Sequence, residues 1–139
     1  MAELSQQVVD LKEMMMLSLL EKESATERLK AVSLTSEMYS ASQKVTNALL
    51  ETLNNDENLN VRLAALEALK PYAKESKVRE ALIRSIAVQE SPLVQVALAE
   101  TMAQMQVKSS VKELEKILKS DKTPADAKSR IKQSIDILI

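Results

Sequence analysis

The 139-residue chain contains no cysteine, no histidine and no glycine. Without thiolates and imidazoles it has no usual ligand set for zinc, no Cys–His nucleophile and no side chain that shuttles protons near neutral pH. The lack of cysteine excludes a disulfide framework. The lack of glycine excludes phosphate-binding P-loops and dinucleotide fingerprints, and it disfavours β-hairpins. We therefore predict no metal, no cofactor and no enzymatic activity.

Aromatic residues are nearly absent, because the chain has no Phe or Trp and only two tyrosines, Tyr39 and Tyr72. A core built from Leu, Ile, Val, Ala and Met favours helices. Nucleic acid is not an expected partner, since the net charge is −1 and no aromatic residues are interleaved with basic ones. The longest apolar run, Met14 to Leu20, is seven residues broken by Ser18, whereas a membrane span needs about 20. We expect a soluble domain that does not itself insert into a membrane.

The charge is unevenly distributed along the chain. Residues 1–57 carry a net charge of −5, and residues 58–139 carry +4. Two interpretations remain open: the basic half attracts an acidic partner, or the charges are ordinary solvated faces of helices.

One pattern repeats every 33–34 residues. A long polar side chain recurs at Arg28, Arg62, Gln95 and Lys128, in steps of 34, 33 and 33, and mostly apolar residues follow it three and seven places later. Such a period is typical of stacked supersecondary units that bury their apolar faces on one another. Because the recurring side chain keeps the register of the core pattern, we interpret it as a structural contact to the neighbouring repeat rather than as a binding row.

Apolar residues at helical intervals predict eight helices joined by short connectors. The predicted ranges are 4–22, 24–38, 42–55, 59–73, 76–88, 92–105, 109–120 and 124–138. The predicted buried stripes of the second helix of each pair are Val45/Leu49/Leu53, Val78/Leu82/Ile86 and Val111/Leu114/Leu118. Pro71 falls inside a predicted helix and predicts a bend, because its ring crowds the carbonyl of Glu67.

Four sites carry sequence signals for helix N-termini. Ser24 and Ser110 begin capping-box patterns with a glutamate three residues later. Ser91 and Thr123 each precede a proline at the expected first helical position. All four are therefore predicted N-caps.

The segment Val61–Leu69, the bend expected at Pro71 and the second helix that begins at Lys77 together resemble HEAT repeats, the helix–turn–helix units of α-solenoids. The resemblance covers residues 24–139. It implies an all-α fold: a right-handed α-α superhelix of about three and a half helical hairpins plus an N-terminal helix, in a single domain over 1–139. The implied parts are a Met-rich helix over 1–23, hairpins over 24–57, 58–91 and 92–122, and a capping helix over 123–139.

A narrower resemblance lies in the run Leu17–Leu29. It is similar to the junction in certain bacterial membrane-anchored HEAT proteins, in which an anti-sigma-type region and one transmembrane helix precede a stalk and a HEAT domain. This resemblance implies an extracytoplasmic domain of an inner-membrane-anchored signalling protein. A cytoplasmic location is the alternative.

The N-terminal helix carries a cluster of three consecutive methionines. Side chains at consecutive positions spread over about 200° of a helix, so one side can cap the first repeat while the other stays apolar. Methionine adapts to irregular partners, but it also fills gaps in a core. We predict a docking or dimer helix, with core packing as the alternative. Its residues are Leu11, Met14, Met15, Met16 and Leu20.

The second helices of α-solenoid repeats line the concave face, where partners bind. Polar residues at i, i+3 and i+7 share one face of a helix and are the predicted partner-binding residues, with solvated surface as the alternative. They are Lys44, Asn47 and Glu51; Lys77, Glu80 and Arg84; and Lys112, Glu115 and Lys119.

We therefore predict a non-enzymatic scaffold that binds a protein or peptide segment. One alternative is a structural module that pairs through the N-terminal helix as a weak homodimer. Another is a HEAT-like lyase of the phycobilin-lyase kind, which the lack of His and the scarcity of aromatic residues disfavour.

Overall fold

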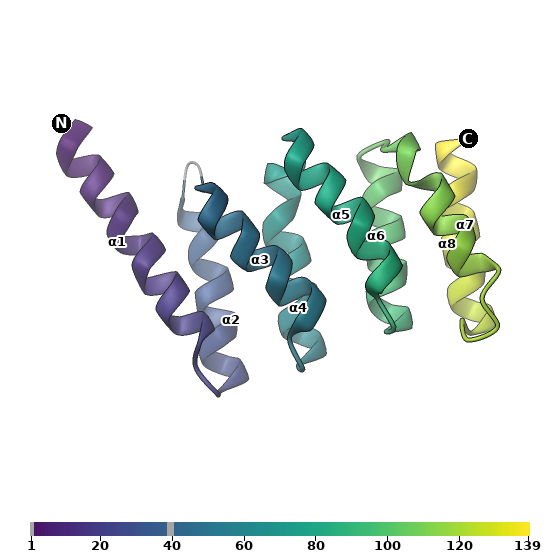
Figure 1. Ribbon diagram of the computed structural model, residues 1–139, viewed down its shortest axis with the longest axis horizontal. Helices are drawn as coiled ribbons and strands as arrows, with labels where there is room; N and C mark the ends of the chain where they lie inside the picture. The colour runs from purple at the N-terminus through teal and green to yellow at the C-terminus, as the bar shows by residue number, and fades with distance from the viewer. Residues whose placement is uncertain (1, 39–40) are drawn as a thin grey trace. The chain divides into compact units, whose positions relative to one another are not determined.

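The computed structural model describes residues 2–38 and 41–139. This part of the chain forms eight α-helices and three short 3₁₀ helices, with no strand (Figure 1). The all-α, HEAT-like fold class is confirmed. The helices are α1 (Ala2–Leu20), α2 (Ala25–Ser33), η1 (Leu34–Glu37), α3 (Gln43–Asn55), α4 (Leu59–Leu69), η2 (Lys70–Tyr72), α5 (Ser76–Val88), α6 (Pro92–Gln104), η3 (Lys108–Ser110), α7 (Val111–Leu118) and α8 (Ala125–Leu138).

The chain divides into two compact units, unit 1 (Met1–Tyr72) and unit 2 (Ala73–Ile139). In unit 1, α1 packs on α2 and α3 packs on α4, and α2 also contacts α4. Figure 1 shows α1 and α3 in one layer of this unit, with α2 and α4 in the layer behind. In unit 2, α7 packs on α8, and α6 contacts both α5 and α8. Each unit is thus a pair of stacked helical hairpins.

The predicted apolar stripes are buried on two of the three second helices. Val45, Leu49 and Leu53 are fully buried on α3, and the predicted stripe of α5 is buried as well. On α7 the buried residues are Leu114 and Ile117, whereas the predicted Val111 and Leu118 are partly exposed. The buried face runs instead through Ser110, Leu114 and Ile117, which share one side at i, i+4 and i+7, so it lies one position away from the predicted stripe at both ends.

Two predicted helices are shorter than expected because they change to 3₁₀ geometry. The range 24–38 divides into α2 and η1, where Ser33, Thr35 and Ser36 each donate a hydroxyl hydrogen bond to the carbonyl three residues earlier. Such local bonds compete with the α-helical ladder. At Pro71 the expected bend is instead the end of an α-helix: α4 stops at Leu69 and η2 follows. Proline has no N–H to continue the ladder.

Three of the four predicted N-caps, Ser24, Ser91 and Ser110, are the N-cap residues of their helices, but among them only Ser91 makes a capping hydrogen bond. The side chain of Ser91 accepts a hydrogen bond from the Val94 N–H at 3.5 Å. The capping box at Ser24 is wrong, since its side chain makes no cap bond. Sequence analysis also missed two caps, at Ser42 and Asn58, whose side chains accept from the N–H three residues later.

Ser110 is the N-cap residue of α7 without a capping bond, whereas the N-cap residue of α8 is Pro124 and not the predicted Thr123. The two hydroxyls fail to cap a helix for the same reason. The hydroxyl of Ser110 donates to the carbonyl of Val107 at 2.7 Å, and that of Thr123 donates to the carbonyl of Ile117 at 3.1 Å. Both side chains are buried and bond back to the preceding turn. In each case the hydroxyl therefore donates to a nearby carbonyl instead of accepting from an N–H at the start of the next helix.

Candidate functional site

The candidate site is a groove in unit 1 between the C-terminal part of α1 and the exposed face of α3. Its volume is about 640 Å³. The lining residues are Leu17, Leu20 and Glu21 from α1 and the turn after it, and Lys44, Asn47, Ala48, Glu51, Thr52, Asn55 and Asp56 from α3 and its C-cap.

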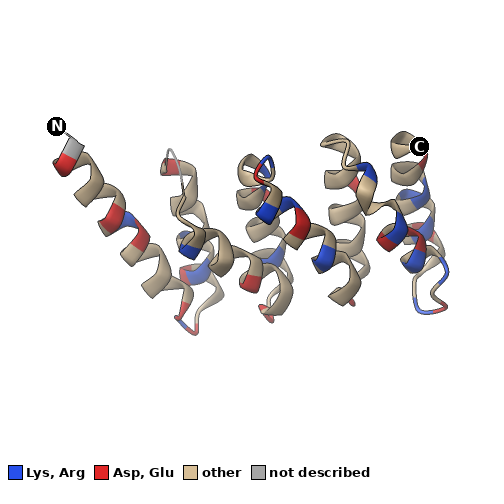
Figure 2. Ribbon diagram, turned by 45° about the horizontal axis from the view of Figure 1, so that its top comes forward, with Lys and Arg blue, Asp and Glu red and all other residues tan. Residues whose placement is uncertain are grey.

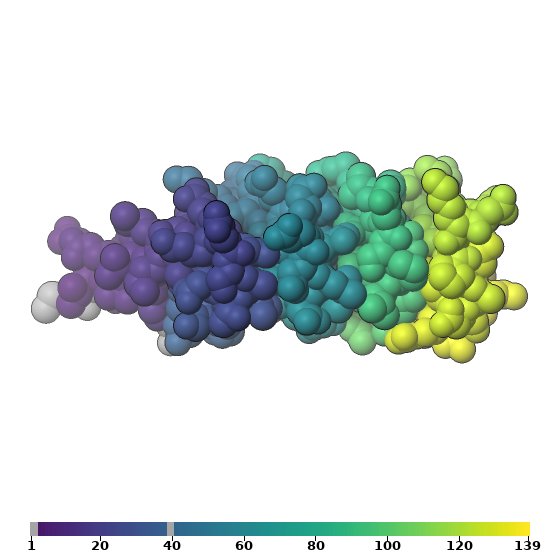
Figure 3. Space-filling view, turned by 90° about the horizontal axis from the view of Figure 1, so that it is seen from below, coloured from purple at the N-terminus to yellow at the C-terminus, as the bar shows by residue number. Residues whose placement is uncertain are grey.

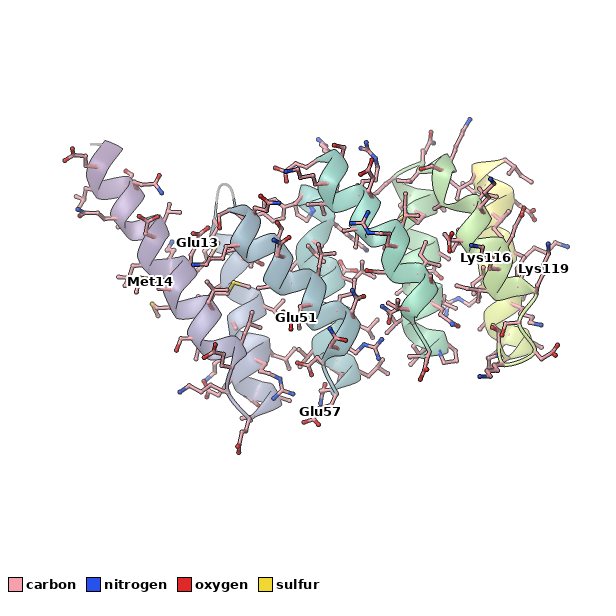
Figure 4. All side chains as sticks on the ribbon, in the orientation of Figure 1. Glu13, Met14, Glu51, Glu57, Lys116 and Lys119 are labelled. Carbon is pink, nitrogen blue, oxygen red and sulfur yellow. The ribbon has the colours of Figure 1, made fainter. Side chains whose placement is uncertain are left out.

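The fold of α3 explains why it presents a polar face to this groove. Its buried stripe packs against α4, so that Lys44, Asn47 and Glu51 project on the other side and are exposed. Figure 4 labels Glu51 on this helix. All three predicted residues of α3 therefore line one groove, together with Leu20 from the predicted docking helix.

The N-terminus of α3 is also tied to α1. Glu13 of α1 accepts a hydrogen bond from the backbone N–H of Ser42, the N-cap residue of α3, at 3.0 Å. A carboxylate is favoured at this end of a helix because the helix dipole is positive there. This bond holds α1 next to the N-terminus of α3. The part of α1 that follows Glu13 supplies Leu17 and Leu20 to one wall of the groove.

The edge of the groove at Asp56 is held by Arg28 of α2. The Nε and Nη2 atoms of Arg28 donate to the two carboxylate oxygens of Asp56 at 2.8 and 3.1 Å. Asp56 Oδ1 also accepts from the N–H of Asn58 at 2.8 Å. The hydrogen bond to Asp56 raises the pKa of Arg28, an effect that partial burial opposes and the negative charges of Asp56 and Glu57 reinforce. Asp56 is thus a structural carboxylate whose charge is already paired.

Three of the four recurring polar residues, Arg28, Arg62 and Gln95, make the predicted contact to the neighbouring repeat, and no such bond is found for Lys128. Arg28 Nη1 donates to the carbonyls of Lys22 and Glu23 at 3.0 and 2.6 Å. Arg62 Nε donates to the carbonyl of Leu53 at 2.9 Å. Gln95 Nε2 donates to the carbonyl of Gln89 at 2.9 Å. In each case the acceptor lies at the C-terminal end of the preceding helix or just after it.

The three consecutive methionines of α1 separate into a buried side and an exposed side. Met16 is 0% exposed, whereas Met14 and Met15 are 67% and 50% exposed. Figure 4 shows Met14 on the side of α1 that points away from α2 and α3. Leu11 is exposed as well, and Leu20 is partly buried in the groove. The predicted docking set is therefore divided between the core, the groove and an open face.

The other two predicted trios lie on α5 and α7 of unit 2, two helices that contact each other. All six residues are exposed, and Figure 2 shows charged residues, in blue and red, along the ribbons of both helices. Lys119 is the C-cap residue of α7 rather than part of its last turn. Each trio holds two bases and one acid, so this face of unit 2 carries a positive excess.

Six of the ten residues that line the groove were not predicted from the sequence, including Leu17, Ala48 and Asp56. The spacing of residues on one helix shows which of them share a face. The second wall of the groove comes from α1, and no local pattern in the sequence shows how close α1 lies to α3. Within residues 2–38 and 41–139 no cluster of acidic side chains is arranged to hold a metal ion. None of the described helices has the length and apolarity needed to cross a membrane.

Comparison with known proteins agrees with this architecture. The family model for HEAT repeats matches residues 46–135. No curated protein and no solved structure matches the chain. The match extends over more than half of the sequence and over helices of both units, from α3 to α8. The chain therefore belongs to the HEAT-repeat family.

Proposed function

We propose that this chain is a non-enzymatic scaffold and that the groove between α1 and α3 binds a segment of a partner protein. HEAT repeats commonly serve as protein-interaction scaffolds. The observation that carries the proposal is the convergence of Lys44, Asn47 and Glu51 with Leu17 and Leu20 in one groove. Because both walls are helices already packed in unit 1, little ordering is needed when a partner binds.

The lining of the groove suggests the chemistry of that segment. Leu17, Leu20 and Ala48 provide an apolar surface that suits an aliphatic or aromatic anchor. The charged lining residues are Glu21, Lys44, Glu51 and Asp56, of which Asp56 is paired with Arg28. The remaining charge is net negative. A segment with an apolar anchor next to a basic residue fits best.

The positively charged faces of α5 and α7 are proposed as a second contact surface, for acidic residues of a partner. Exposed charges of this kind act mainly on association rate and selectivity, and they are screened by salt. Reversal of Lys77, Arg84, Lys112 and Lys119 together should slow the association of an acidic peptide without reducing helicity. An unchanged association rate at low salt would contradict this assignment.

A peptide library tests the groove directly. A random peptide library is selected on the intact chain, and the peptides recovered are measured by fluorescence anisotropy. We expect enrichment of an apolar residue next to Lys or Arg. Ala48→Arg places a long charged side chain in the groove and should weaken binding by about tenfold or more, since blocking an apolar anchor removes a dominant contact.

The matched control is Ala125→Arg, at an exposed alanine that begins α8. It makes the same change outside the groove, so its binding should equal that of the unmodified chain. Circular dichroism of both variants checks that the helices are retained. Peptides that bind Ala48→Arg as tightly as Ala125→Arg would show that the groove is not the site.

The finer proposal is that the scaffold is the sensory or regulatory part of a membrane-anchored bacterial signalling protein. Its support is the resemblance of Leu17–Leu29 to the junction found in such proteins. An upstream sequence with a transmembrane helix and a zinc-binding anti-sigma-type region would support it. Flanking sequence without those two features would contradict it.

A further inference from the structure

The outer face of α1 is an apolar stripe with coiled-coil spacing. Leu4, Val8, Leu11 and Met15 follow one another in steps of 4, 3 and 4 residues, which is the spacing of core positions in a heptad. Their exposed fractions are 63%, 47%, 57% and 50%. Among the residues whose exposure the structure describes, nine large hydrophobic ones are exposed, and five of them lie on α1, namely these four and Met14. A concentration of this kind on one helix indicates a contact surface rather than scattered surface residues.

The stripe is distinct from the face with which α1 packs in its own unit. At 100° per residue, its four members fall within an arc of about 60°, and the fully buried Met16 lies about 100° away from Met15. In Figure 3 the purple side chains of α1 form the surface of unit 1 at its N-terminal end. The stripe also shares no residue with the groove.

A small hollow lies next to the N-terminal half of the stripe. Its volume is about 320 Å³. Leu4 and Val8 belong to both features, and two further apolar side chains line the hollow, Val9 of α1 and Met38 at the end of η1. The C-terminal half of the stripe instead carries protruding methionines, Met14 and Met15. One end of the helix thus has a recess, and the other end has flexible side chains that can fill one.

We propose that α1 pairs with α1 of a second copy of this chain, antiparallel, about a twofold axis between Val8 and Leu11. In that register Val8 faces Leu11 of the second copy and Leu4 faces its Met15, so that all four layers are apolar and the interface is self-complementary. The antiparallel direction also brings Met15 of each copy next to Leu4 at the edge of the other copy's hollow. A parallel pair would place both hollows at the same end of the seam, away from Met15, and leave them unfilled.

The charge of α1 favours a second copy of this chain over a lipid surface as the partner that covers the apolar stripe. Helix α1 carries Glu3, Asp10 and Glu13 against a single base, Lys12. An anionic membrane would repel this helix, since interfacial helices bind through basic residues on their polar face. In the antiparallel pair Lys12 lies next to the uncharged Ser5 of the second copy, so no like charges meet across the seam.

The size of the stripe sets the expected strength of the dimer. Twelve helical residues span only about 18 Å, and stable dimers bury roughly 800 Å² on each partner over about 20 to 30 residues. This interface falls in the weak class. We expect a dissociation constant on the order of 10 to 100 μM.

Sedimentation velocity of the intact chain from about 2 to 300 μM tests the proposal over that range. The unmodified chain should change from monomer to dimer. Leu11→Glu should remain a monomer throughout. Leu93→Glu, the same change at a residue of α6 that is 55% exposed, should dimerise as the unmodified chain does. A monomeric unmodified chain at the highest concentration, or equal loss in both variants, would overturn the proposal.

A charge exchange tests the antiparallel direction. In the double variant Val8→Lys, Leu11→Glu, an introduced base in each copy faces an introduced acid in the other when the helices are antiparallel. The double variant should then form dimers within the concentration range in which Leu11→Glu remains a monomer. In a parallel pair like charges would meet instead, so a double variant no better than the single one would refute this arrangement. Both sites are exposed, and thermal melts by circular dichroism verify that each variant is folded.

Discussion

The three consecutive methionines of α1 offer a test of how that helix is seated, because one substitution at adjacent positions should give very different results. Met16 is fully buried and Met14 is 67% exposed. Truncation of a buried methionine to alanine typically costs about 2–5 kcal/mol, through lost burial and the cavity left behind. Truncation of an exposed residue usually changes stability by less than about 0.5 kcal/mol. We expect Met16→Ala to lower the free energy of unfolding by at least about 2 kcal/mol more than Met14→Ala.

Urea denaturation followed by circular dichroism measures this difference. For a slope of about 1–3 kcal/mol/M, a loss of 3 kcal/mol lowers the midpoint by roughly 1–3 M. The experiment is done near 1 μM protein, below the dissociation constant expected for the α1 pair, so that self-association does not contribute. Equal midpoints for Met16→Ala and Met14→Ala would show that the face of α1 that carries Met16 does not pack against α2 and α3. Met16→Ala should also weaken peptide binding, because α1 supplies one wall of the groove.

Two further predictions concern helix caps and the ion pair beside the groove. Asn58→Ala should lower the free energy of unfolding by about 1 kcal/mol, since its side chain caps α4, whereas Ser24→Ala should lower it by less than about 0.5 kcal/mol. Equal losses in chemical denaturation would contradict the assigned caps. Because the pKa of Arg28 is raised in the fold, its contribution to stability is fully present below its ordinary pKa and is lost only as the pH rises through the still higher folded value. The loss of stability in Arg28→Met should therefore be the same near pH 7 and near pH 10, and a loss that shrinks at the higher pH would show that this reasoning is wrong.

The positions of the helices could be predicted because they depend on a local pattern. The repeat marked by Arg28, Arg62 and Gln95 and the apolar spacing between these positions locate all eight helices to within a few residues. The outcome at Pro71 shows the limit of such patterns. A missing N–H is visible in the sequence, but whether a helix bends or ends there depends on what the following residues pack against.

Only one of the two walls of the groove, the one formed by α3, could be predicted from the sequence. The exposed trio on α3 can be predicted because it lies on the side of the helix opposite to the buried Val45, Leu49 and Leu53, and the spacing within a single helix shows this. The opposite wall depends on where α1 lies, and that is fixed by contacts between distant residues, such as the bond from the Ser42 N–H to Glu13. The apolar stripe on α1 is different, because the spacing of Leu4, Val8, Leu11 and Met15 is visible in the sequence. The three methionines alone do not show which face of the helix is buried.

The absence of glycine links the repeat to the stability of the helix ends. Helices commonly end with a glycine in the left-handed conformation, which lets backbone N–H groups reach their last carbonyls. Here a long polar side chain from the next helix donates to a carbonyl in the last turn of α3 and to carbonyls just beyond the ends of α1 and α5. At the end of α7 the hydroxyl of Thr123 takes this role. After α6 the backbone itself does so: Gln106 has a φ of 57°, and the N–H groups of Gln106 and Val107 donate to the carbonyls of Ala103 and Met102. The recurring Arg28, Arg62 and Gln95 are therefore explained as helix-end donors in a chain that has no glycine to offer. They need no partner molecule to account for them, and the surfaces proposed for recognition, namely the groove, the outer face of α1 and the charged faces of α5 and α7, include none of the three.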